Sequence, residues 1–527
     1  MFNWMNRKSG PWSLETLAPP WGSGRPLYEI VVENPHLALP DEDPAARLKW
    51  AAGALDGVMG HHLGRGDATD KLKRVLDALR ALLDRSTDSN FRRLYDALCE
   101  GQVLGYVDQL LPEIDRTHSS DGPRLAALAR LLLTRAPRRE PVKFGIAVLG
   151  MTGSATDVDM LRQIGACDDF TLFAAVAIRN LSPRYERDLW ELAKAVEGWG
   201  RIQVVERLSH TEDYEIRAWL LREGFRNAVM NEYLACICAR AGRLHEALRV
   251  SAKDPVLLDA ATDLMLAMIS GGPAEDIDDY EDAAEAIEAY LDALWVQQTF
   301  KPKFFVVIDR IREWLTSEEG WDKRSKCGWT LESRGRCLVL SQELLKNEKW
   351  KIDAVVDLGS PDGDVFHWAN SAARKLGIDT WDVLFAKVAE DPIRSTFWYE
   401  LTEATDGPRI DKVISFAEHV LPLDEIASGP SDEMGLGVGF EPHGTLDWML
   451  QLLDRFPGKG WNLIRTGLRS PVVRNRNWSL RVFKNWRKED WPSDANDVLR
   501  AAVEAEPEDD VRKNLEAFLE GRSDSDQ

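Results

Sequence analysis

A stretch near the C-terminus, residues 459–488, contains nine lysines and arginines and no acidic residue. The chain as a whole is acidic, since 87 Asp and Glu outnumber 66 Lys and Arg and give a net charge of −21. Cations that gather beside aromatic rings can bind a phosphate, a carboxylate-rich peptide or a base. The segment therefore predicts a binding site for an anionic partner.

Helical spacing places part of this segment on one face. Arg474, Trp478 and Arg481 follow one another at intervals of four and three, so they lie on the same side of a helix. The same arginines could instead hold neighbouring helices together, or the acidic half of the chain could lie against them. The candidate binding residues are Arg474, Arg476, Trp478, Arg481 and Lys484.

Motifs for nucleotide, metal and nucleophilic chemistry are degenerate. Gly435, Gly437 and Gly439 lack the preceding strand of a dinucleotide-binding loop. The sequence around Lys459 lacks the Ser or Thr of a phosphate-binding loop. There is no His-Glu-x-x-His motif, and the nine His and six Cys are scattered along the chain. We therefore predict no catalytic residue, no cofactor and no metal site.

Composition limits the class of protein. At 527 residues the chain is too long for one ordinary core, and its 44% hydrophobic and 29% charged residues are typical of packed helices with one face in water. The N-terminus has no apolar run long enough for a signal peptide, and no stretch is long enough for a membrane helix. We expect a cytoplasmic protein that does not bind membranes. The acidic charge disfavours nucleic acids as partners.

Apolar residues recur at helical spacing along most of the chain, which predicts an all-α fold. Thirteen of the 20 Trp lie from Trp295 onward, so the second half should pack tightly around large aromatic rings. The acidic run within 275–288 is the expected boundary between the two halves. The predicted segments are an irregular N-terminal segment (1–45), an N-terminal helical region (46–140), helical repeats (141–253), an acidic loop with a helical middle region (254–360), Trp-rich C-terminal repeats (361–521) and a tail (522–527).

The segment KFGIAVLGMTGSATDVDMLRQIGACDDFTLFAAVAIRNL alternates helices with Gly-containing turns. Three later segments combine a polar cap, an aliphatic residue three positions on, and then Arg. They are Asp213, Ile216 and Arg217; Ser470, Val473 and Arg474, with Pro471 at the first helical position; and Glu508, Val511 and Arg512. This pattern resembles the HEAT family, and the resemblance implies an α-solenoid of stacked antiparallel helix pairs.

The C-terminal third, including GWNLIRTGLRSPVVRNRNWSLRVFKNW, is similar to a group of uncharacterised bacterial HEAT-like proteins, some of which carry the label limonene hydroxylase. Our first hypothesis for the function is a non-catalytic scaffold that binds a protein partner, possibly an acidic one. A second is a nucleic-acid-binding protein or DNA glycosylase-like enzyme that uses segment 459–488. A third is the oxygenase of the label, which would require haem, flavin or iron and for which the sequence offers no site.

Overall fold

The secondary structure is helical throughout. The computed structural model describes residues 12–40, 51–61, 69–393 and 396–521. Over these ranges the chain forms α-helices and short 3-10 or π turns but no β-strand, and one isolated parallel bridge joins Glu433 to Val472. The prediction of an all-α fold is confirmed for the described part of the chain. No helix among these residues has the length and apolar character needed to cross a membrane.

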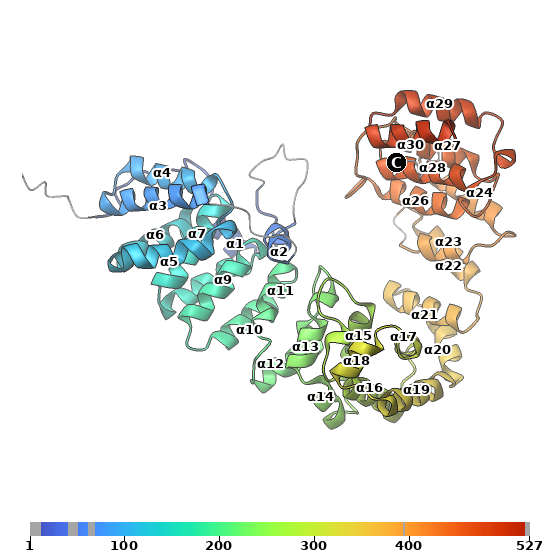
Figure 1. The fold of residues 1–527 in the computed structure, drawn as a ribbon, viewed down its shortest axis with the longest axis horizontal. Helices are drawn as coiled ribbons and strands as arrows, with labels where there is room; N and C mark the ends of the chain where they lie inside the picture. Colours follow the sequence, from blue (N-terminus) through green and yellow to red (C-terminus); the bar gives the residue numbers. More distant parts are fainter. Residues whose placement is uncertain (1–11, 41–50, 62–68, 394–395, 522–527) are drawn as a thin grey trace, which may run out of the picture. The chain divides into compact units, whose positions relative to one another are not determined.

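The chain divides into two compact units, Met1–Glu348 and Lys349–Gln527. In the first unit, helices pack mainly against their neighbours in sequence, for example α8 against α9, and α6 against α7 (Figure 1 labels the latter two). Its helices are α1 (Leu27–Glu33), α2 (Ala54–His61), α3 (Thr69–Asp84), α4 (Asp88–Cys99), α5 (Val107–His118), α6 (Gly122–Arg135), α7 (Arg139–Thr152), α8 (Val158–Gly165), α9 (Asp168–Leu181), α10 (Tyr185–Ala195), α11 (Trp199–Glu206), α12 (Tyr214–Trp219), α13 (Ala235–Ala241), α14 (Leu244–Val250), α15 (Pro255–Ser270), α16 (Ala283–Gln297), α17 (Pro302–Thr316), α18 (Trp321–Arg324) and α19 (Leu331–Leu345).

The second unit follows the same plan, and α28 packs against both α26 and α27. Its helices are α20 (Lys349–Asp357), α21 (Gly363–Lys375), α22 (Trp381–Glu390), α23 (Trp398–Ala404), α24 (Ile410–Val420), α25 (Leu423–Ile426), α26 (Glu441–Leu453), α27 (Trp461–Leu468), α28 (Val473–Asn485), α29 (Ala495–Ala505) and α30 (Asp509–Leu519). The core of this unit contains several Trp. Trp350, Trp381 and Trp398 are fully buried, and the indole of Trp381 donates a hydrogen bond to the Thr405 hydroxyl at 2.9 Å.

Small residues bring α7 and α9 into close contact. A Cβ atom added to Gly150 on α7 would lie 2.8 Å from Ala177 on α9. Ala174 and Ala175 on the same helix are completely buried. A larger side chain at Gly150 or Ala177 would force the two helices apart, and Ala174 makes a similar close contact with Gly165 on α8. This packing explains the small residues in the segment that resembles HEAT repeats.

One helix lies in the segment that we expected to be irregular. Helix α1 begins directly after Pro26, and its residues Leu27, Ile30 and Val31 are buried. These three residues have the spacing of one helical face, and α1 packs against α6 and α8. The prolines around it limit its length but do not prevent it from forming.

The acidic run within 275–288 lies inside the first unit, between α15 and α16, and not at the division between the units. Cations of nearby helices pair with several of its acids. Arg240 pairs with Glu275 and Glu281, and the Arg324 guanidinium donates to the Asp278 carboxylate with an N–O distance of 2.7 Å. The run therefore joins helices within one unit.

A buried charge cluster connects α2, α7 and the chain before α5. The Lys143 ammonium lies 2.7 Å from the Asp56 carboxylate and 3.4 Å from that of Glu140. Glu140 also accepts a hydrogen bond from the Val103 amide at 2.6 Å. Burial raises the pKa of Asp56 and of Glu140, because desolvation outweighs the one positive charge that they share. Burial alone would lower the pKa of Lys143, but the two carboxylates hold it above its ordinary value.

Candidate functional site

Segment 459–488 folds mainly into α27 and α28, and acids from other parts of the chain pair with many of its cations. The ion pairs are Lys459 with Asp411, Arg474 with Asp447, Arg476 with Glu506, Arg481 with Asp454, and Arg487 with Glu489 and Asp490. A segment that contains no acid in the sequence is therefore largely neutralised in the folded unit. These partner acids lie in the second unit and not in the acidic run within 275–288, so the acidic half of the chain does not supply these pairs.

Arg476 is buried and not part of an exposed face. Its side chain is 1% exposed, and its guanidinium forms two hydrogen bonds of 2.7 Å with the Glu506 carboxylate. The same guanidinium donates to the carbonyls of Ser431, Ser470 and Pro471 at 2.8 to 2.9 Å. Every face of this cation is thus occupied by the protein itself. The prediction that Arg476 flanks an exposed binding face is wrong.

Arg476 belongs to a recurrent contact, which we call the arginine clamp. In three helices, the fourth residue is an arginine that donates to the carbonyl of the residue six positions earlier. The pairs are Arg217 with Thr211, Arg476 with Ser470, and Arg512 with Glu506, at 2.8 to 2.9 Å. The guanidinium thereby satisfies a carbonyl of the turn before each helix.

The clamp corrects the register that we assigned to α28. Asp213 and Glu508 precede α12 and α30 as predicted, but α28 begins at Val473, so its clamp arginine is Arg476 rather than Arg474. Pro471 is not the first helical residue, because the chain stays extended up to Val472. The Val473 amide donates to the Glu433 carbonyl at 3.1 Å, and the Glu433 amide donates to that of Pro471 at 3.3 Å.

The other candidate residues do lie together on α28. Arg474 and Arg481 are partly exposed, and the Arg481 guanidinium lies 4.9 Å from the centre of the Trp478 ring. Lys484 is exposed on the same helix. A shallow depression of about 430 Å³ runs along this face; it is lined by Met434, Val473, Arg474, Asn477, Trp478 and Arg481. An indole and two aliphatic side chains thus lie between two arginines.

The loop beside this depression exposes three apolar side chains. Met434, Leu436 and Val438 are 63%, 64% and 98% exposed. They alternate with Gly435, Gly437 and Gly439, which all have positive φ, and a Cβ on Gly435 would lie 2.6 Å from Val472. Glycine is required where φ is positive and the backbone passes this close to a neighbour. The three glycines shape this loop, and no nucleotide-binding fold surrounds them in the described residues.

A buried polar network lies beneath the α28 face. The Ser470 hydroxyl is 3.1 Å from His443 Nδ1 and donates to Asn475 Oδ1 at 2.8 Å. Asn475 donates to the Asp447 carboxylate, which also accepts from Arg474. Burial raises the pKa of Asp447, although Arg474 and Asn475 both hydrogen-bond to it. The histidine and serine are 27 positions apart in the sequence, and nothing in the local pattern around either residue indicated this contact.

A serine beside a histidine is the arrangement of a nucleophile and its base, but this serine cannot meet a substrate. Ser470 is completely buried, and its hydroxyl oxygen also accepts a hydrogen bond from the Val472 amide at 3.1 Å. Its hydrogen-bonding capacity is therefore used within the protein. The network positions the start of α28 against α26.

Replacing Ser470 with alanine should lower the free energy of unfolding by about 1–3 kcal/mol. The substitution removes a buried acceptor of the Val472 amide and a partner of His443. Urea unfolding monitored by circular dichroism would measure the loss. Ser493→Ala is the control, because Ser493 is exposed. If the two variants are equally stable, the Ser470 hydroxyl forms no hydrogen bond that matters to folding.

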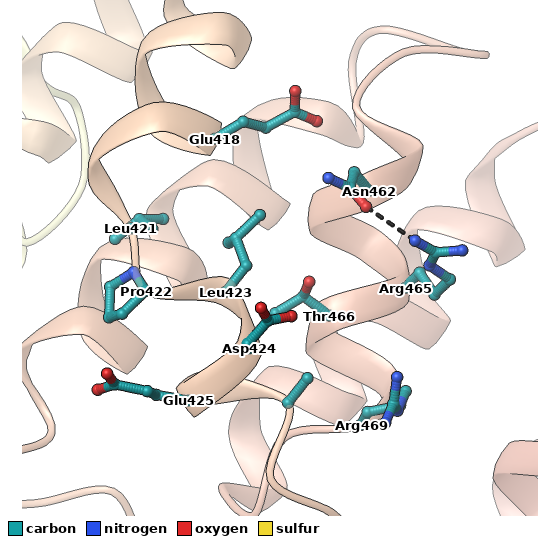
Figure 2. Close-up of a pocket in the computed structure, with 11 residues that line it drawn as sticks. Glu418, Leu421, Pro422, Leu423, Asp424, Glu425, Asn462, Arg465, Thr466 and Arg469 are labelled. Atoms are coloured by element: carbon teal, nitrogen blue, oxygen red, sulfur yellow. Dashed lines mark hydrogen bonds between the residues drawn. The ribbon is translucent and has the colours of Figure 1, made fainter.

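A second depression, of about 500 Å³, lies between α27 and the turn from α24 to α25 (Figure 2). Arg465 and Arg469 line it on the α27 side, and Glu418 and Asp424 lie on the opposite side. These two arginines belong to segment 459–488, so its cations are divided between two surfaces. This division could not be predicted from the sequence, because it depends on how α27 and α28 pack.

Metal-binding clusters are absent from the part of the chain that the structure describes, and four of the six cysteines are buried. No cluster of three His, Cys, Asp or Glu residues there could hold a metal ion. Burial raises the pKa of the Cys167, Cys236 and Cys337 thiols to about 12. At neutral pH these thiols are protonated and are therefore poor nucleophiles.

Comparison with known proteins gives no relative. No protein-family model matches the chain. No curated protein matches it either. No solved structure matches the fold. The structure shows an all-helical protein, over the residues it describes, in which helices pack against their neighbours in sequence. The resemblance to HEAT repeats stays an interpretation of the sequence.

Proposed function

We propose that this protein is a non-catalytic scaffold that binds another protein through the second unit. On this proposal the packed helix pairs form a HEAT-like α-solenoid that acts in the cytoplasm. The observation that carries the proposal is the apolar loop beside the α28 face. Three neighbouring apolar side chains in water, next to an indole, favour a protein partner because contiguous exposed apolar surface is otherwise unfavourable.

The chemistry of this surface defines the partner. Met434, Leu436 and Val438 offer apolar contact, and Arg474 and Arg481 lie beside them. A segment with apolar side chains flanked by Asp or Glu would bury the first group and pair with the second. Nucleic acid draws less support, because the loop exposes apolar side chains and the chain carries a net charge of −21.

Photo-crosslinking in the native host tests the proposal. A benzophenone amino acid at Val438 should capture a protein through a segment that contains both apolar and acidic residues. Adding Leu436→Asp or Arg481→Glu should reduce the yield about tenfold, which corresponds to about 1.4 kcal/mol of binding energy. Neither variant should change stability by more than about 0.5 kcal/mol, because both side chains are exposed.

Leu331→Asp is the matched control, since Leu331 is an exposed leucine at the start of α19 in the first unit. It introduces the same carboxylate and should leave the yield unchanged. A yield that none of the variants alters would contradict the proposal, as would capture through a segment without acids. If Arg481→Glu unfolds the protein, the arginine holds helices together and does not serve a partner.

A further inference from the structure

The depression of about 500 Å³ has opposite charges on its two sides. Asn462, Arg465, Thr466 and Arg469 recur at helical spacing and line it from α27. Three acids line the other side: Glu418 from α24, and Asp424 and Glu425 from α25 (Figure 2). The Leu421, Pro422 and Leu423 segment lies between Glu418 and Asp424. The volume falls within the range of small-molecule sites, about 300–1,000 Å³.

These charges do not pair with one another. Among the described residues, no nitrogen of Arg465 or Arg469 lies within 4.0 Å of a carboxylate oxygen. The Arg465 guanidinium instead donates to Asn462 Oδ1 on its own helix at 3.0 Å (Figure 2). Elsewhere in this unit arginines find carboxylates, as Arg409 does with Asp379 and Arg476 with Glu506.

Several of these charges are favourable within their own helices, but none of these described side chains pairs across the depression. Arg465 lies in the last turn of α27 and Arg469 is its C-cap residue, and Asp424 lies in the first turn of α25, as the helix dipole favours. A purely anionic ligand would be attracted by the arginines and repelled by Glu418 and Asp424, and a purely cationic ligand would meet the reverse. A molecule that carries both charges would satisfy both sides at once, since guanidinium groups bind carboxylates in a bidentate manner.

We infer that this depression binds a small zwitterion with a free carboxylate and a free ammonium group, such as an amino acid or a short peptide with both ends free. Arg465 and Arg469 hold the carboxylate, and Glu418 and Asp424 hold the ammonium group. Thr466 and Asn462 add neutral hydrogen-bonding groups between them. The site goes beyond the proposed scaffold function and uses residues that the protein-binding face does not contain.

Titration of the full chain with glycine, Ala-Ala and Ala-Ala-Ala tests the inference, because these probes differ in the separation of their charges. Ligand-observed NMR would measure the affinity of each free probe and that of its N-acetylated, C-amidated and doubly blocked forms. At least one free probe should bind, and each of its blocked forms should bind at least tenfold more weakly. If no free probe binds better than its blocked forms, the inference is wrong. Binding of the N-acetylated form as tightly as the free form would indicate a simple anion site and would also overturn it.

Two variants assign the binding to this depression. Arg469→Gln should weaken binding of the best probe about tenfold, because it removes one of the two carboxylate partners. Arg374→Gln is the matched control: Arg374 is also exposed and without an ion pair among the described residues, but it lies on α21 outside the depression. Equal weakening by both variants would overturn the assignment. Far-ultraviolet circular dichroism should show that both variants are folded.

Discussion

Glu506→Ala should lower the free energy of unfolding of the second unit by about 3–5 kcal/mol. The Glu506 carboxylate is the only acid paired with Arg476 among the described residues, and both side chains are 1% exposed. Without it the guanidinium keeps its charge in a buried site with carbonyl partners only. The Glu506 side chain also accepts from the Glu508 amide at 3.1 Å, so the start of α30 loses a contact as well.

Urea unfolding followed by circular dichroism would give the size of this loss, and hydrogen exchange of α28 and α30 would locate it. Glu489→Ala serves as the control, because the Arg487–Glu489 pair is exposed and should contribute no more than about 1 kcal/mol. A loss for Glu506→Ala as small as that of the control would mean that the buried pair adds nothing to stability.

Lys143→Met should destabilise the first unit by about 3–5 kcal/mol at pH 7, because it leaves the buried Asp56 and half-buried Glu140 carboxylates without their cation. The difference in the free energy of unfolding between wild type and variant should shrink as the pH falls toward 4. Burial already raises the pKa of both carboxyl groups, and loss of the ammonium group should raise both pKa values further. The folded variant then binds more protons than the unfolded chain above the ordinary carboxyl pKa, so its stability falls as pH rises through that window.

Chemical denaturation at several pH values between 4 and 7, with wild type and variant side by side, would measure this dependence. Lys194→Met is the control, since Lys194 pairs with Glu191 at the surface of α10 and should lose less than about 1 kcal/mol at any pH. A Lys143→Met deficit that is independent of pH would show that the lost contact is one of packing and not of charge.

The helical fold could be predicted because it depends on neighbouring residues, but only one of the three predicted caps forms. The N-cap of α28 is Val472 and not Ser470, and the Glu508 side chain makes no capping hydrogen bond at α30. Apolar spacing predicts helices, and Asp213 accepts hydrogen bonds from the first amides of α12 as a polar cap should. The burial of tryptophans in the second half could also be predicted, because large aromatic rings are buried where helices pack together. Helix α1 differs from the prediction because its buried residues Leu27, Ile30 and Val31 stabilise a helix between prolines that predict an irregular chain.

The candidate site could be predicted only in part, because its properties depend on contacts between distant residues. Arg474, Trp478 and Arg481 do share a face of α28, which follows from their spacing. The burial of Arg476 depends on Glu506, 30 residues later, and the start of α28 depends on pairing with Glu433. The charge of segment 459–488 likewise depends on acids that the local sequence does not contain.

The arginine clamp places a constraint on chain length. Its guanidinium reaches a carbonyl six residues back in α12, α28 and α30. One inserted residue would displace that carbonyl by up to roughly 3.5 Å, beyond hydrogen-bond range. These three joints should therefore resist insertions and deletions even where their side chains change freely.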